Sequence, residues 1–95
     1  MIDRLTRRDF EGLSDGSVSF EYEGLRVPLA VHELRDLPVN AHRAEPFAVV
    51  LAGPAQPMVP QGTHALNHPV HGRLELFVVP LGRQSASLHY EIIFN

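Results

Sequence analysis

The chain contains no cysteine, no lysine and no tryptophan. Without cysteine it can form no disulfide bond, no thiolate metal site and no thiol nucleophile. Its eight basic residues are all arginine, and they are spread along the chain instead of gathering in one stretch. The fold must therefore be stabilised by a hydrophobic core, and 95 residues are enough to build one.

Positive charge is also scarce, since the formal net charge is −3 at pH 7. Proteins that bind nucleic acid need clustered basic side chains to neutralise phosphates, so we expect no nucleic-acid partner. No apolar run approaches the ~20 residues that span a bilayer, so we expect no membrane segment. The stretch "LTRRDFEGL" imitates a twin-arginine export signal, but polar and acidic residues follow it where an apolar segment is needed. We therefore expect a cytoplasmic protein.

The same stretch predicts a short N-terminal helix. Thr6 suits the N-cap position, and Asp9, three residues later, favours the positive end of a helix. Leu5 and Phe10 have the spacing of a hydrophobic staple across that N-terminus. We expect one to two helical turns, ended by one of the glycines that follow.

Alternating apolar and polar residues predict a hairpin in the first third of the chain. Apolar side chains stand at every second position from Val18 to Tyr22 and again from Leu25 to Val31. The turn between them falls at Glu23 and Gly24. Pro28 cannot donate a hydrogen bond within a sheet, so it predicts an edge position or a bulge in the second strand.

The middle of the chain predicts two strands separated by loops. Residues 35–45 are polar and without periodicity, which indicates a surface loop. "PFAVVLA" is apolar on both faces and predicts a central strand. "GPAQPMVPQG" predicts a connector stiffened by its prolines, and "THALNH" predicts a short strand that ends before Pro69.

The last third predicts a second hairpin. "GRLELFVVPLG" alternates, becomes apolar throughout and closes at Pro80 and Gly82, whereas "SASLHYEIIFN" alternates over its whole length. The loop at Gly82 would join these two strands. About six short strands with turns between them predict a mainly β fold, a small antiparallel barrel or sandwich with a short N-terminal helix, in a single domain over residues 1–95.

Five stretches, "LTRRDFEGL", "EPFAVVLAGP", "PQGTHALNHP", "GRLELFVVPLG" and "YEIIFN", together resemble a family of short bacterial domains of unknown function. The resemblance covers nearly the whole chain. It implies a mostly β fold, no established activity and an association with phage-tail-like proteins. In the pattern of this family the position of His64 is usually aromatic, that of His71 is variable, and His68 before Pro69 matches. This difference argues against a shared three-histidine site.

Three histidines, His64, His68 and His71, lie within "HALNHPVHG" and raise the question of a metal site. Two imidazoles that share a metal ion need ligating nitrogens about 3 to 3.5 Å apart. On one strand face His64 and His68 would lie about 13 Å apart, and Pro69 disfavours the helix that would bring them together. His71 could fold back onto His68, which would make a site of only two ligands. We predict structural or solvent-facing histidines with no metal and no cofactor, and a site of His64, His68 and His71 is the alternative.

Ser87, His89 and Glu91 have the residue types of a hydrolytic triad on one strand face. Successive members would stand about 6.6 Å apart along a straight strand. No sharp nucleophile turn accompanies them. We expect a polar outer face, on which His89 and Glu91 pair with Arg73 and Glu75 of the neighbouring strand.

Glu21 and Glu23 also share one strand face, which is the pattern of paired catalytic carboxylates. Nothing in the sequence would raise the pKa of one carboxyl and not the other, so a solvated face is the simpler explanation. The glycines have no phosphate-binding spacing. We therefore predict that the protein is not an enzyme.

We predict a non-catalytic β module that binds a protein partner or copies of itself. The proline connector would present apolar side chains to that partner, and the loop at 35–45 would provide a second surface. The predicted contact residues are Pro57, Met58, Val59, Pro60, His42 and Arg43. The alternative is a small-ligand or metal-binding barrel with His68 and His71 at its mouth.

Overall fold

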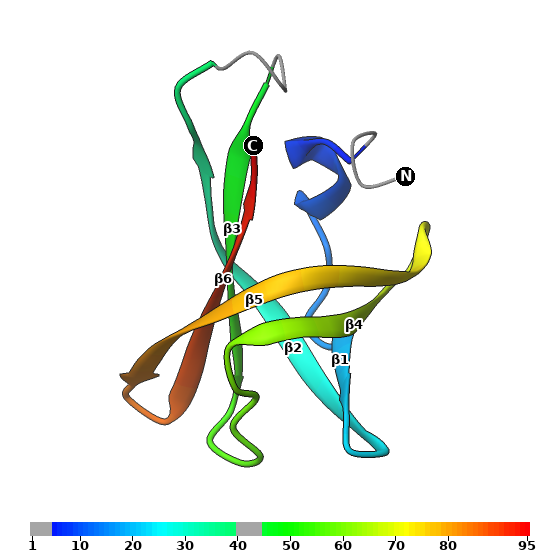
Figure 1. Cartoon of the computed structure of the whole chain (residues 1–95), viewed down its shortest axis with the longest axis vertical. Coiled ribbons are helices and arrows are strands. Elements are labelled where there is room, and N and C mark those ends of the chain that lie inside the picture. The colour runs from blue at the N-terminus through cyan, green and yellow to red at the C-terminus, as the bar shows by residue number, and fades with distance from the viewer. Residues whose placement is uncertain (1–4, 40–44) are drawn as a thin grey trace.

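The computed structural model describes residues 5–39 and 45–95, and its strands wrap into a small barrel (Figure 1). Within these residues a 3-10 helix, η2, precedes the strands. The elements are η2 (Arg7–Phe10), β1 (Val18–Tyr22), β2 (Leu25–Asp36), β3 (Phe47–Pro54), β4 (Gly62–His68), β5 (Gly72–Gln84) and β6 (Ser87–Phe94). No helix in the described part of the chain is long and apolar enough to cross a membrane.

The strands close in the order β1-β2-β3-β6-β5-β4, and every neighbouring pair is antiparallel. The predicted six-stranded antiparallel β fold is confirmed, and it is a closed barrel. The two longest strands, β2 and β5, each pair with one neighbour over their first half and with a different neighbour over their second half. β2 pairs with β1 up to Leu29 and with β3 from Ala30, while β5 pairs with β4 up to Val78 and with β6 from Val79.

Both long strands extend further than the sequence pattern predicts. Residues 35 and 36 belong to β2 and not to the predicted loop, and β5 continues through Pro80 and Gly82. A shift of register occurs between Val31 and Glu33 in β2 and between Pro80 and Gly82 in β5. An extra residue at such a bulge moves the following side chains to the opposite phase, which hides the continuation of the strand from a period-two pattern.

The structure confirms the first predicted turn, places the last turn elsewhere and shows how β2 accommodates Pro28. The turn of the first hairpin lies at Glu23 and Gly24, as predicted, and both residues have positive φ. The last hairpin turns at Ser85, with φ 56°, and not at Gly82. Pro28 faces Ser19 of β1, and because pairing with β3 begins only at Ala30, the ring removes no hydrogen bond on that side.

The predicted alternation places the apolar side chains inside the barrel. The core combines inward residues from all six strands with side chains from η2 and from the β3–β4 connection. Phe10 of η2 and Val59 of the connection are both 0 % exposed. Phe10 packs 6.1 Å from Phe47 and 5.7 Å from Phe94, between ring centroids. The N-terminal turn therefore fills one end of the barrel.

This N-terminal turn forms where the sequence predicts a helix, although it comprises a single 3-10 turn of four residues. The backbone N–H of Thr6 donates to the carboxylate of Asp9 at 2.8 Å, and the N–H of Asp9 donates to the carbonyl of Thr6 at 3.0 Å. Leu5 and Phe10, the predicted staple pair, are both buried in the core. Local hydrogen bonds and two apolar anchors thus hold a helix that is too short to be stable alone.

Candidate functional site

The β3–β4 loop, residues 55–61, contains most of the predicted contact residues. Met58 is 60 % exposed, whereas its neighbour Val59 is 0 % exposed and belongs to the core. The prediction that Val59 faces a partner is therefore wrong, because this side chain fills the barrel beneath the loop. Pro57 is half-buried and Pro60 is exposed.

Two hydrogen bonds fix the loop immediately after Met58. The backbone N–H of Val59 donates to the hydroxyl oxygen of Tyr90 at 3.1 Å, and the imidazole Nε2 of His64 donates to the carbonyl of Pro60 at 2.7 Å. Tyr90 is fully buried and meets the ring of Phe20 edge-on at 5.3 Å. The exposed methionine therefore projects from a backbone that is anchored to the core.

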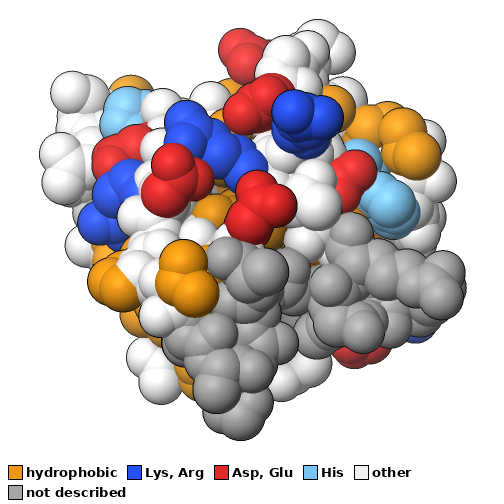
Figure 2. All heavy atoms as spheres, turned by 90° about the horizontal axis from the view of Figure 1, so that it is seen from above, with side chains coloured by type: hydrophobic (Ala, Val, Ile, Leu, Met, Phe, Trp, Pro, Cys, Tyr) orange, Lys and Arg blue, Asp and Glu red, His pale blue; other side chains and the backbone are white. Residues whose placement is uncertain are grey.

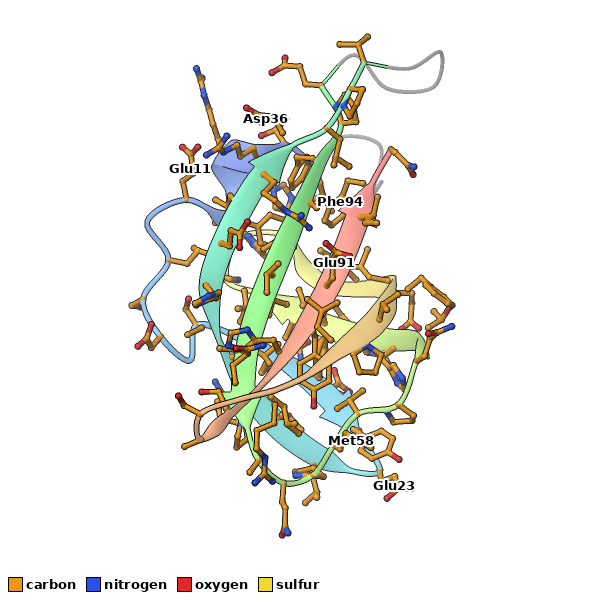
Figure 3. All side chains as sticks on the ribbon, turned by 90° about the vertical axis from the view of Figure 1, so that its left-hand side faces the viewer. Glu11, Glu23, Asp36, Met58, Glu91 and Phe94 are labelled. Carbon is orange, nitrogen blue, oxygen red and sulfur yellow. The ribbon has the colours of Figure 1, made fainter. Side chains whose placement is uncertain are left out.

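The end of the barrel that holds this loop also holds the β1–β2 and β5–β6 turns (Figure 1). Met58 and Glu23 lie at this end in Figure 3, far from Asp36 at the other end. Leu25, beside the β1–β2 turn, is 56 % exposed. The other two predicted contact residues, His42 and Arg43, lie outside the described residues.

Of the three clustered histidines, His71 folds back onto His68, with ring centroids 5.0 Å apart, whereas His64 lies apart from both. His64 lies near the start of β4, and His68 is the last residue of this strand. The ring of His64 meets Tyr22 edge-on at 5.8 Å, whereas that of His68 meets Phe10 edge-on at 5.3 Å. Within residues 5–39 and 45–95, no group of three or more histidine and acidic side chains is arranged to hold a metal ion.

His68 is a structural residue that is only 5 % exposed. Its Nδ1 accepts hydrogen bonds from the backbone N–H groups of Val70 and His71, at 3.1 and 3.3 Å. Its Nε2 lies 2.6 Å from the carbonyl oxygen of Asp9, and since a carbonyl only accepts, the proton is on Nε2. Both ring nitrogens are thereby used to tie the β4–β5 turn to the N-terminal turn.

His71 strengthens the same connection from outside. Its Nε2 lies 2.8 Å from a carboxylate oxygen of Asp9. Burial raises the pKa of the Asp9 carboxyl, but the hydrogen bonds from His71 and Thr6 outweigh burial and hold this pKa below its ordinary value. His68 and His71 therefore hold the β4–β5 turn against the N-terminal turn.

His89 and Glu91 have different partners from those predicted. Glu91 pairs with Arg35 of β2 across the intervening strand β3. The ring of His89 lies against that of His32, also in β2. The prediction that these side chains meet Arg73 is wrong, because Arg73 belongs to the part of β5 that pairs with β4.

Arg73 instead forms ion pairs on the outer face of the sheet that contains β1 and β4. Its guanidinium lies 3.2 Å from the carboxylate of Glu21 and 3.4 Å from that of Glu75. Glu21 also accepts a hydrogen bond from the side-chain amide of Asn67 at 3.0 Å. Glu21 is thus committed to a surface network, and Glu23 occupies the hairpin turn with φ 50°.

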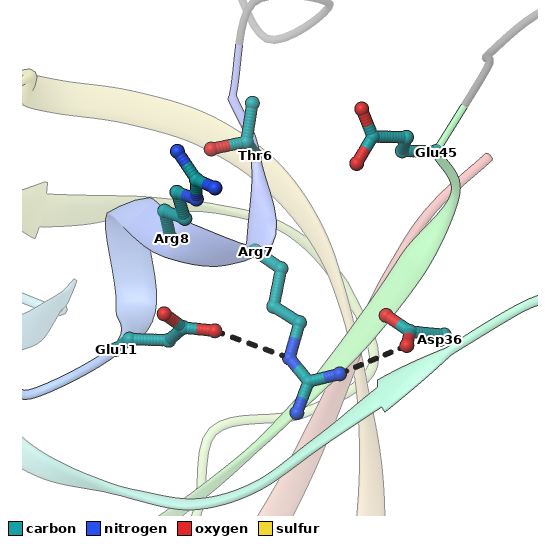
Figure 4. Close-up of a pocket in the computed structure, with 6 residues that line it drawn as sticks. All are labelled: Thr6, Arg7, Arg8, Glu11, Asp36 and Glu45. Atoms are coloured by element: carbon teal, nitrogen blue, oxygen red, sulfur yellow. Dashed lines mark ion pairs between the residues drawn. The ribbon is translucent and has the colours of Figure 1, made fainter.

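The end of the barrel that carries η2 is strongly charged, and Figure 2 shows acidic and basic side chains intermingled across it. A hollow of about 470 Å³ lies there, lined by Thr6, Arg7, Arg8, Glu11, Asp36 and Glu45. The Arg7 guanidinium joins Glu11 at 3.4 Å and Asp36 at 3.0 Å (Figure 4). These ion pairs satisfy the charge of Arg7 from within the protein, so its visible role is to attach η2 to β2.

Comparisons with known proteins place this barrel in a family without assigning it an activity. No curated protein and no solved structure matches the chain. The model of one domain family, "Domain of unknown function (DUF6916)", matches residues 5–94. The match spans nearly the whole chain, including both turns joined by His68. The chain therefore belongs to the DUF6916 family of domains of unknown function.

Proposed function

We propose that this domain is a non-catalytic binding module that docks onto a protein partner, or onto another copy of itself, through the β3–β4 loop. One observation carries the proposal: Met58 is 60 % exposed although the next residue, Val59, is fully buried. The hydrogen bonds to Tyr90 and His64 hold the loop in this arrangement. An apolar side chain is thus offered to solvent from a fixed position.

This arrangement suits recognition for two physical reasons. A loop that is already ordered loses little conformational entropy when it binds, so more of the contact energy appears as affinity. Methionine is flexible and polarisable, and it adapts to apolar surfaces of different shape. Leu25 adds a second exposed apolar side chain at the same end of the barrel (Figure 1).

The polar side chains that the sequence analysis considered for chemistry support a binding role over a catalytic one. His64 and His68 hold loops and turns by hydrogen bonds to backbone groups. Glu21 and Glu91 are paired with arginines. The resemblance to domains associated with phage-tail-like proteins makes a subunit of such an assembly the partner that we propose.

The test compares untagged wild-type protein with Met58→Asp and with the control Val70→Asp. Val70 is 79 % exposed and lies in the β4–β5 turn, at the side of the barrel away from the loop (Figure 1). Light scattering coupled to size exclusion over a range of concentrations reports self-association, and circular dichroism confirms that all three proteins fold. Dissociation of a wild-type oligomer by Met58→Asp alone supports docking between copies.

If the wild-type protein is monomeric, the same three proteins are immobilised and exposed to native lysate. A protein retained by the wild type and by Val70→Asp, but lost with Met58→Asp, supports docking onto that partner through the loop. A monomer that retains no protein, or one that retains the same proteins in all three forms, contradicts the proposal.

A further inference from the structure

Two histidines meet on the outer face of the sheet formed by β2, β3 and β6, the face seen in Figure 3. They are His32 of β2 and His89 of β6, and their ring centroids lie 4.4 Å apart with the ring planes inclined at 45°. Their strands are not neighbours, because β3 runs between them. Two strand spacings amount to about 9.5 Å, so both imidazoles must lean inward over β3.

Two local features make this approach possible. Ala52 of β3 faces His89 in register, and its other neighbour in the sheet is Ala30 of β2. These small side chains leave room above β3 for two rings. His32 is the extra residue at the register shift between Val31 and Glu33, and a bulge of this kind redirects a side chain without ending the strand.

The ring nitrogens of this pair are free, in contrast to those of the other described histidines. His64, His68 and His71 each hold a protein oxygen at 2.6 to 2.8 Å. Among residues 5–39 and 45–95, neither the side chain of His32 nor that of His89 has a hydrogen bond or an ion pair, and the two rings contact each other. His32 is exposed and His89 is half-buried, so solvent reaches the pair.

We propose that His32 and His89 form a two-ligand site for a divalent transition-metal ion that prefers imidazole nitrogen, Cu²⁺ above all, with water as the remaining ligand. This inference does not depend on the binding role of the β3–β4 loop. Imidazole nitrogen is a common ligand of Cu²⁺, Ni²⁺ and Zn²⁺, whereas Mg²⁺ and Ca²⁺ prefer oxygen.

The separation of the rings agrees with the geometry that Cu²⁺ prefers. A metal–nitrogen bond of about 2 Å, with about 1.1 Å more to the ring centre, places each centroid about 3.2 Å from the ion. Two imidazoles at the right angle of a tetragonal site then have centroids about 4.5 Å apart, against about 5.2 Å at a tetrahedral angle. The observed 4.4 Å lies close to the first value.

The surrounding charge also favours a cation. Glu33 follows His32, and Glu91 lies two residues from His89 on the same strand face. Arg35 pairs with both carboxylates, so the three side chains together carry one negative charge. Because these carboxylates are held by Arg35, the site has two protein ligands, and its affinity should be moderate.

In the test, untagged protein is titrated with Cu²⁺. Calorimetry measures the affinity, and electron paramagnetic resonance identifies the ligands of the bound ion. The variants are His32→Gln and His89→Gln, and the matched control is His71→Gln, which removes an exposed imidazole elsewhere. We expect one Cu²⁺ of moderate affinity per wild-type chain, with two nitrogen ligands in the spectrum. Each variant of the pair should weaken binding at least tenfold, and the control should bind like the wild type. Mg²⁺ should not compete.

Wild-type affinity in both His32→Gln and His89→Gln, or a loss of binding only in the control, overturns the site. Ala52→Leu adds an independent test, because it keeps both imidazoles and fills the space between them. Weaker copper binding in this variant supports convergence of the rings above β3, and unchanged binding contradicts it. Circular dichroism verifies the fold of each variant.

Discussion

Replacing Tyr90 by phenylalanine tests whether the β3–β4 loop is anchored through the core. The substitution removes one hydroxyl from a fully buried side chain and leaves the edge-on contact with Phe20 in place. The backbone N–H of Val59, which donates to that hydroxyl at 3.1 Å, then has no acceptor. A buried donor without a partner costs about 1 to 3 kcal/mol. For a domain of this size that loss lowers Tm by roughly 4 to 8 °C per kcal/mol.

The measurement is urea and thermal unfolding followed by circular dichroism, with Tyr22→Phe as the control. Tyr22 is half-buried and has its ring edge-on to His64, so the loss of its hydroxyl should change stability by less than about 0.5 kcal/mol. Tyr90→Phe should also weaken any contact made through Met58, because the loop loses an anchor. If both variants are as stable as the wild type, the hydroxyl of Tyr90 does not hold the loop, and the argument from a preordered Met58 fails with it.

Three further substitutions test other parts of the structure. His68→Phe removes the acceptor for two backbone N–H groups of the β4–β5 turn and the donor to the Asp9 carbonyl, so it should lower the free energy of unfolding by about 2 to 5 kcal/mol in a denaturant titration. Asp9→Asn should destabilise the protein near neutral pH, because the folded-state pKa of Asp9 is lowered. The contribution of Asp9 to stability is complete above the ordinary carboxyl pKa and is lost as the pH falls through the lower folded-state value. The stabilities of wild type and variant should therefore begin to approach each other below about pH 4 and become equal only below the folded-state pKa. Gly53→Ala would place a Cβ 3.0 Å from the Leu29 side chain, and thermal unfolding should show a loss of about 1 to 3 kcal/mol, while equal Tm values would show that this side chain moves aside freely.

Strand faces could be predicted wherever one side of a strand packs on the core and the other meets solvent. Tyr90, Ile92 and Phe94 show this in β6, because a buried face imposes period two on the sequence. β3 could be predicted as central because both of its faces are covered. Ala48 and Val50 point away from the core and are still buried, beneath the ion pair that crosses from β2 to β6.

The ends of β2 and β5 could not be predicted, because a bulge removes the signal on which the prediction depends. After the shifts at Val31 and at Pro80 the apolar positions change phase, so a continuing strand has the pattern of a loop. Proline added to this effect, since Pro80 was interpreted as the end of a strand that in fact passes through it.

The roles of individual side chains were beyond the reach of local patterns, because their partners are distant in the sequence. His68 meets Asp9 across 59 positions, and Val59 meets Tyr90 across 31. Val59 was predicted to be exposed because nothing near it indicates that its loop fills the barrel end. His32 carried no signal at all, since its neighbour His89 becomes visible only once β2 and β6 are placed on either side of β3.

β2 pairs first with β1 and then with β3, and β5 pairs first with β4 and then with β6. This arrangement has a consequence for the cooperativity of unfolding. Because each of these strands runs without interruption from one neighbour to the other, we expect the opening of one half of the barrel to disturb the register of the other half. Amide protons of β1 and β3 should therefore exchange with solvent through a common global opening and not as separate units. The barrel also depends on β1 meeting β4 and β3 meeting β6, pairings between distant segments, so we expect it to fold more slowly than a protein of the same size with mainly local contacts.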